Sequence, residues 1–195
     1  MHSYPLSLSF KMIAISPQVR VADSTGRLIM YVRQKAFKLR EDVTVYSDEQ
    51  QRFELLRIKA DRIIDVSATY TIRDRSDQVV GAVRGQGIRS LWRRSFAILD
   101  SAGQEIGSIV EDNPWVKVVD GVVGELPLVG WIAAMFINPA YTVTFRGAPT
   151  LHLVKKPSFL ERHFEVQRLA DVTESDEQLL LASLLMMLLL VRGTG

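Results

Sequence analysis

The chain has 195 residues and a mass of 22.0 kDa, enough for one domain with a sizeable core. Hydrophobic residues make up 47% and charged residues 24%, which excludes a globally disordered or collagen-like protein. The absence of cysteine excludes disulfides, thiolate metal sites and thiol nucleophiles, and a formal net charge of +2 is too small for a dedicated nucleic-acid-binding protein.

Charge is unevenly distributed along the chain. Residues 1–110 carry 17 basic and 12 acidic side chains, whereas residues 111–195 carry 7 and 10. Two interpretations of the basic part stay open. It either presents a face to anionic partners such as lipid headgroups, or it is an ordinary solvated surface.

At the start of the chain, apolar Leu6, Leu8, Phe10 and Met12 alternate with polar residues. This alternation predicts a strand with one buried face. The segment lacks the basic stretch and uninterrupted apolar run of a secretory signal, so a cytoplasmic location is expected.

A hairpin pattern then recurs along the chain. Residues 70–83 align with residues 96–109, and residues 19–32 form a looser copy. Each copy has an alternating run, an Asp-led turn and a second alternating run, which predicts a β-hairpin with one solvated face. The acidic residues that open these turns are expected to cap backbone N–H groups rather than to bind a metal. They are Asp23, Asp74 and Asp100.

Further alternating segments bring the predicted total to about twelve short strands, which indicates a sandwich or a barrel. These additional strands are expected at residues 35–39, 43–46, 53–59, 141–145, 151–155 and 164–169.

The best candidate ligand site in the sequence is the connection between two hairpin copies, residues 84–94. Here Arg89, Arg93 and Arg94 surround Trp92. Guanidinium groups bind phosphate bidentately, and an indole ring suits the headgroup layer of a membrane. In the alternative interpretation Trp92 closes one end of the barrel and the arginines pair with nearby acids.

Two apolar segments punctuated by Gly and Pro, residues 114–124 and 127–137, predict a helical insertion at about residues 114–137. The second segment carries Trp131, Met135 and Phe136. These side chains either protrude and contact a membrane interface or a partner subunit, or they pack beneath the barrel as core.

The C-terminal region contains thirteen uncharged residues, 179–191, which predict a central helix at about residues 176–192. Thirteen helical residues span roughly 20 Å, whereas a bilayer core is about 30 Å thick. Ser175 and Gln178 suit a capping box at the start of the helix. A helix that is apolar on every side must be surrounded by apolar protein or lipid, and here a closed sheet around it is expected. Its one polar residue, Ser183, is expected to bond a carbonyl one turn back.

These elements resemble the LURP-one-related branch of the tubby C-terminal-like superfamily, which is related to phospholipid scramblases. The resemblance implies a mainly β protein: one domain over residues 1–195, with a closed antiparallel barrel of about 12 strands around a buried helix. It also implies lipid binding, since tubby domains bind phosphoinositides through basic residues, although no such motif aligns with particular residues here. The matching stretches are residues 30–41, the hairpin from Tyr70, residues 89–94, residues 113–117, residues 138–141 and Phe164–Val166 with the leucine-rich helix that follows.

Catalytic and cofactor motifs are not found in the sequence, which lacks G-x-S-x-G, Walker A and H-E-x-x-H patterns. The histidines His2, His152 and His163 are dispersed; the last two could meet in space, and an enzyme would need one of them beside a carboxylate at the barrel mouth. The protein is therefore expected not to be an enzyme and to need no metal or cofactor.

The expected function is non-enzymatic binding of anionic phospholipid or a membrane surface, in a regulatory or scaffolding role. The protein would be cytoplasmic or peripherally attached to a membrane, and no nucleic-acid partner is expected. The alternative is a protein-interaction or oligomerisation domain, homo-oligomeric or with another protein, that uses residues 127–137.

Overall fold

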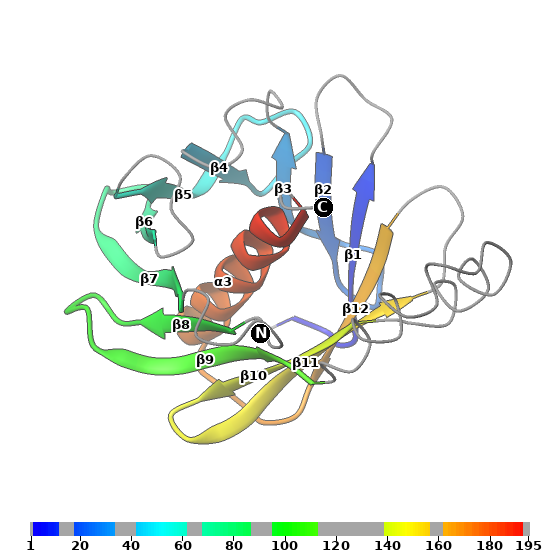
Figure 1. The fold of residues 1–195 in the computed structure, drawn as a ribbon. Coiled ribbons are helices and arrows are strands. Elements are labelled where there is room, and N and C mark those ends of the chain that lie inside the picture. Colours follow the sequence, from blue (N-terminus) through cyan, green and yellow to red (C-terminus); the bar gives the residue numbers. More distant parts are fainter. Residues whose placement is uncertain are drawn as a thin grey trace, which may run out of the picture.

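Twelve antiparallel strands close into a barrel around a single long helix in the computed structural model (Figure 1). The structure describes residues 2–11, 18–33, 42–61, 68–86, 95–112, 139–156 and 162–192. Each strand pairs with its neighbours in the chain, and β1 pairs with β12 to close the barrel. The elements are β1 (Leu6–Lys11), β2 (Gln18–Ala22), β3 (Leu28–Arg33), β4 (Asp42–Tyr46), β5 (Glu54–Ala60), β6 (Thr69–Asp74), β7 (Val79–Gly85), β8 (Ser95–Leu99), β9 (Glu105–Glu111), β10 (Ala140–Phe145), β11 (Ala148–Lys156), β12 (Arg162–Arg168) and α3 (Glu174–Arg192).

The predicted fold class is confirmed: the protein is mainly β, with a closed twelve-stranded antiparallel barrel and a C-terminal helix packed inside it. The expected strands at 43–46, 53–59, 141–145, 151–155 and 164–169 correspond to β4, β5, β10, β11 and β12. The expected strand at 35–39 and the expected helical insertion at about 114–137 lie outside the described residues.

The start of the helix differs from the expectation. Helix α3 begins at Glu174, and Thr173 is its N-cap, because the Thr173 hydroxyl accepts a hydrogen bond from the N–H of Asp176 at 3.2 Å. The expected cap, Ser175, instead lies within the first turn. The predicted pairing of Ser175 with Gln178 was therefore wrong, because a better placed hydroxyl precedes it by two residues.

Alternation along the strands supplies the wall of the core, and α3 fills its centre. In β1, for example, Leu6, Leu8 and Phe10 are buried, and the serines between them face outward. All residues from Leu179 to Leu189 are buried, on every side of the helix. The hydroxyl of Ser183 donates to the carbonyl of Leu179 at 2.8 Å, as predicted.

The three Asp-led turns have the expected geometry. In each, one carboxylate oxygen accepts the backbone N–H groups two and four residues later, at 2.8–3.0 Å. In the Asp23 turn the Thr25 hydroxyl also donates to this oxygen, and it is the main cause of a pKa for Asp23 below the usual value. These carboxylates are structural caps of hairpin turns.

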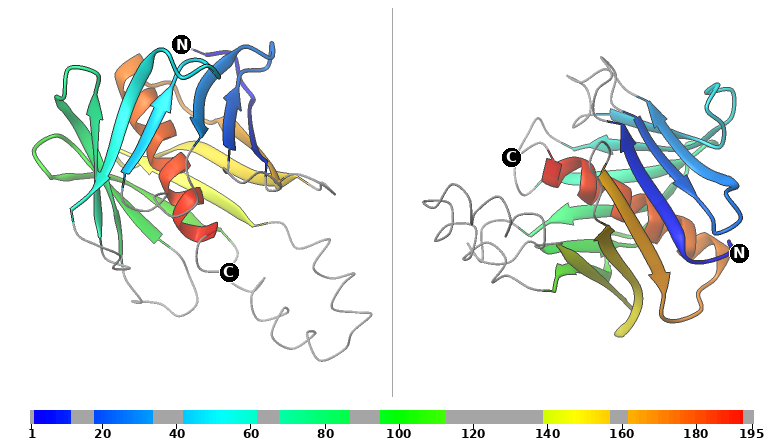
Figure 2. Two further views of the ribbon diagram at one scale, coloured as in Figure 1. Left: turned by 90° about the horizontal axis from the view of Figure 1, so that it is seen from above. Right: turned by 90° about the vertical axis from the view of Figure 1, so that its right-hand side faces the viewer.

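The barrel has two different ends (Figure 2). At one, which we call the turn end, five short turns join β2 to β3, β4 to β5, β6 to β7, β8 to β9 and β10 to β11, and α3 begins. At the opposite end, which we call the loop end, α3 finishes and the other connections depart from the described strands. Consecutive antiparallel pairing of all strands places successive connections at alternate ends of the barrel.

At the turn end a buried ion pair anchors α3 to the barrel. Arg168 faces inward from the end of β12 and donates to Glu177 of the helix at 3.0 Å; the Glu177 side chain is 1% exposed. The Arg168 guanidinium also lies over the Tyr4 ring, 4.3 Å from its centre, and donates to the carbonyl of His2. Burial, and secondarily the Glu177 carboxylate, raise the pKa of Tyr4, so its phenol stays neutral into the alkaline range.

This geometry predicts a large and non-additive effect of Arg168 on stability. We expect Arg168→Met to lower the free energy of unfolding by about 3–5 kcal/mol, because it leaves Glu177 buried without its partner. The double variant Arg168→Met/Glu177→Met should be more stable than Arg168→Met alone. Urea denaturation of the three proteins measures both effects.

The matched control is Arg57→Met, which removes an exposed ion pair with Glu54 on the outer face of the barrel. It should cost at most about 1 kcal/mol. Equal losses from Arg168→Met and Arg57→Met would contradict the anchoring role.

The hairpin formed by β6 and β7 contains a glycine, Gly81, that the close packing of α3 requires. A Cβ atom at Gly81 of β7 would lie 2.5 Å from the backbone oxygen of Leu99 and 2.8 Å from a side-chain carbon of Leu179. The first contact is with backbone and cannot move aside easily. A larger residue would therefore separate β7 from β8 or push α3 out of register.

We expect Gly81→Ala to destabilise the protein by about 1–3 kcal/mol through overpacking, as measured by thermal and urea denaturation. The control is Ser76→Ala in the exposed tip of the same hairpin, where only the backbone N–H of Ser76 is bonded. This variant should stay within about 0.5 kcal/mol of the parent. A neutral Gly81→Ala variant would show that the helix does not approach β7 this closely.

Candidate functional site

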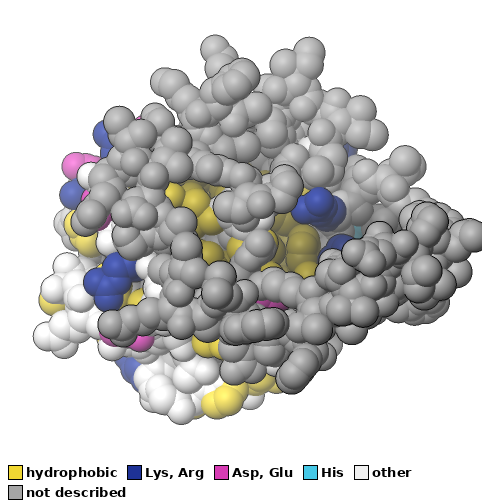
Figure 3. All heavy atoms as spheres, viewed as in Figure 1, with side chains coloured by type: hydrophobic (Ala, Val, Ile, Leu, Met, Phe, Trp, Pro, Cys, Tyr) yellow, Lys and Arg dark blue, Asp and Glu magenta, His cyan; other side chains and the backbone are white. Residues whose placement is uncertain are grey.

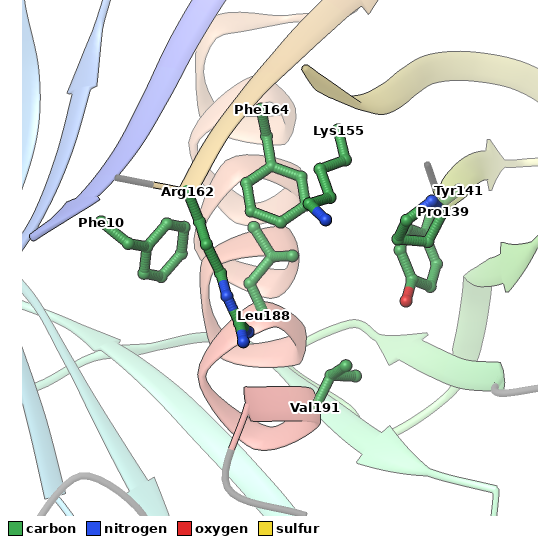
Figure 4. A pocket seen from close by; sticks show the side chains of 8 residues that line it. All are labelled: Phe10, Pro139, Tyr141, Lys155, Arg162, Phe164, Leu188 and Val191. Carbon is green, nitrogen blue, oxygen red and sulfur yellow. The ribbon is translucent and has the colours of Figure 1, made fainter. Parts of the chain in front are cut away.

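The loop end contains a pocket of about 190 Å³ at the point where α3 finishes (Figure 4). It lies among β1, β10, β11, β12 and the last turns of the helix. Two basic side chains, Lys155 and Arg162, line it. The remaining lining is apolar or aromatic: Phe10, Pro139, Tyr141, Phe164, Leu188 and Val191.

Strand alternation explains why two cations face the barrel interior. In β11, Leu151 and Leu153 are buried, so Lys155 follows on the same inner face. In β12, Phe164 and Val166 are buried, so Arg162 precedes them on the inner face. The register agrees, because Lys155 stands opposite Phe164, and Arg162 stands opposite Phe10.

Neither cation forms an ion pair or a side-chain hydrogen bond with the described part of the chain. Two neighbours show the contrast. Lys156, which faces outward, pairs with Glu165 at 3.1 Å, and Arg168, on the same strand and face as Arg162, pairs with Glu177 at 3.0 Å. The inner face of β12 thus carries an arginine at each end, one with a carboxylate partner and one, at the loop end, without.

The apolar wall beside these cations is well packed. Phe10 and Phe164 meet edge to face, with ring centres 5.7 Å apart and planes at 72°. Both rings and Leu188 are at most 8% exposed, whereas Arg162 is exposed at the rim and Lys155 is half-buried. The pocket therefore has an apolar floor and a cationic rim.

Figure 4 shows how the two cations are arranged. The Arg162 side chain extends along the helix past Leu188, and the Lys155 side chain lies on the other side of the Phe164 ring. In the surface view of the same end, hydrophobic side chains are visible in patches near the centre, with Lys and Arg side chains to one side of them (Figure 3). A ligand that reached this floor would pass between positive charges.

Two negative charges oppose the cations at this end of the barrel. The carboxyl end of α3 carries a partial charge of roughly −0.5, and Glu111 of β9 faces inward opposite Tyr141, with 3% exposure. Two full positive charges line the pocket itself, and Glu111 does not. The balance inside the pocket favours an anion.

The residues predicted from the sequence lie outside the described part of the chain. These are Arg89, Trp92, Arg93 and Arg94, and also Trp131, Met135 and Phe136. They belong to the connections between β7 and β8 and between β9 and β10, whose flanking strand ends lie at the loop end.

Lys155 and Arg162 were not predicted as site residues from the sequence, although the alternation of buried positions places both on the inner face. Lys155 lies two residues after the buried position 153, and Arg162 lies two residues before the buried position 164. This placement was overlooked because a basic residue at a strand end usually faces solvent.

His152 has a carboxylate partner that the sequence did not reveal. Its Nε2 lies 2.9 Å from an oxygen of Asp112, whose other oxygen accepts a hydrogen bond from the Thr142 hydroxyl at 2.6 Å. The expectation that His152 and His163 could meet was wrong, because His152 stands opposite Gln167, and His163 opposite Lys156, further along β12. Among the described residues, no group of three or more His, Asp or Glu side chains is placed to hold a metal ion.

Within the described residues, no helix combines the length and the apolar character that crossing a bilayer requires. Comparison of the chain with protein-family models, with curated proteins and with solved structures found no match. The functional argument for this protein therefore depends on its own residues, above all on the pocket at the loop end.

Proposed function

We propose that the protein is a non-enzymatic binding domain for anionic lipid at a membrane surface, and that the loop end is its binding face. One observation carries the proposal: Lys155 and Arg162 line an apolar pocket and lack a carboxylate partner among the described residues. Lys155 is half-buried beside apolar side chains, so its ammonium group loses part of its hydration, and an anionic ligand would offset that cost.

The chemistry of lipid headgroups suits this site. A phosphate oxygen pair accepts two parallel hydrogen bonds from a guanidinium group, and an ammonium group adds a point charge. By sequence position, the arginine-rich residues 89–94 connect strands whose ends lie at the same end of the barrel. The resemblance to the LURP-one-related and scramblase-like proteins, which we also propose as the family of this chain, supports the same class of ligand.

The test is co-sedimentation with phosphatidylcholine vesicles, with and without phosphatidylserine, at low and at physiological salt. We expect binding that requires the anionic lipid and weakens as salt is added. Each of Lys155→Met and Arg162→Met should weaken binding about fivefold, the equivalent of about 1 kcal/mol per basic side chain.

Lys156→Met is the matched control, because it removes the same charge from the neighbouring outward-facing position. It should reduce binding less than Lys155→Met does. No binding to anionic vesicles at low salt would refute the proposed function. If the protein instead shows a concentration-dependent mass that polar substitution of Trp131 and Phe136 abolishes, the oligomerisation alternative is favoured.

A further inference from the structure

The size of the pocket limits what it can enclose. Helix α3 fills the barrel, with Leu184 and Leu185 fully buried directly below the last two turns, so no channel continues from the pocket along the axis. The volume of the pocket is about 190 Å³, and a cavity of roughly 150 Å³ holds a benzene molecule. The pocket therefore suits a group of about six to eight non-hydrogen atoms.

The arrangement of apolar and charged side chains in the pocket determines which end of a ligand enters first. Phe10, Phe164 and Leu188 form a floor that is almost completely buried, whereas Lys155 is half-buried beside the Phe164 ring and Arg162 is exposed. An amphiphile would enter with its apolar end first and would leave its anionic group beside the two cations. The reverse orientation would place a charge against aromatic and aliphatic carbon.

We propose that the pocket binds a single small anionic amphiphile: one carboxylate or phosphate monoester on a short unbranched alkyl chain of about six carbon atoms. Lys155 and Arg162 would bind the anionic group, and Phe10, Phe164 and Leu188 would enclose the chain. The inference goes beyond the proposed function, which concerns a bilayer surface, because it assigns the pocket itself to a molecule that dissolves in water.

The experiment is calorimetric titration of the full chain with butanoate, hexanoate and octanoate in the absence of vesicles. Each methylene that enters the pocket should tighten binding by up to about fourfold. We expect this gain from butanoate to hexanoate, and a much smaller gain from hexanoate to octanoate, because the floor is reached. Hexanol has the alkyl chain without the charge, whereas acetate and inorganic phosphate have the charge without a long alkyl chain. All three should bind at least about tenfold more weakly than hexanoate.

Two variants test the cations. Lys155→Met and Arg162→Met keep an unbranched apolar stem at each position and should each weaken hexanoate binding about tenfold. Lys156→Met should bind hexanoate as the parent does. Thermal denaturation without ligand checks the fold, and melting temperatures at or above that of the parent are expected, because each substitution removes an unpaired cation.

Three results would overturn the inference. The first is that hexanoate fails to bind the parent, the second that acetate or phosphate binds as tightly as hexanoate, and the third that the two variants melt at lower temperature yet bind hexanoate normally. The last result would mean that Lys155 and Arg162 instead stabilise the carboxyl end of α3 by interacting with the helix dipole. Vesicle binding without hexanoate binding would refute this inference but not the proposed function, and hexanoate binding without vesicle binding would do the opposite.

Discussion

The structure depends on one constraint: α3 is apolar on every side. From Leu179 to Leu189 no face of the helix is suited to water, so the helix needs an apolar wall around its whole circumference. A closed barrel provides such a wall, and each strand contributes by presenting alternate residues inward. The glycine at position 81 follows from the same constraint, because the helix comes too close to β7 for a side chain there.

The two ends of the barrel surround the two ends of α3 with different contacts. At the turn end, four of the five short turns are capped by their own carboxylates, and Arg168 joins β12 to Glu177 in the first turns of α3. At the loop end, the inner face of β12 repeats an arginine, but the described residues offer Arg162 no carboxylate. The same strand therefore carries an arginine paired with a carboxylate at one end and, at the other, an arginine without a carboxylate partner among the described residues.

This asymmetry is the reason to place function at the loop end. The Asp23, Asp74 and Asp100 carboxylates are used by backbone N–H groups, and the Asp112 carboxylate is used by Thr142 and His152 on the outer face. The cations of the pocket have no such internal role among the described residues. We therefore propose anion binding as the chemistry of the loop end.

The sequence by itself determined the strand pattern, the hairpin turns and the central helix, because these depend on local periodicity and on turn residues close together in the chain. It also indicated the burial of α3, since thirteen uncharged residues without a polar stripe leave few other solutions. Only the tertiary structure decided which cations face inward without a carboxylate partner among the described residues. Arg162 and Lys155 have no distinguishing motif in the sequence, and they line a pocket because β1 closes on β12 and places Phe10 beside them at the end of the helix. The partner of His152 was hidden because Asp112 is 40 residues away in the chain, and the pairing of β10 with both β9 and β11 brings the two together. Both contacts join residues far apart in the sequence, so neither can be inferred from a short stretch of it.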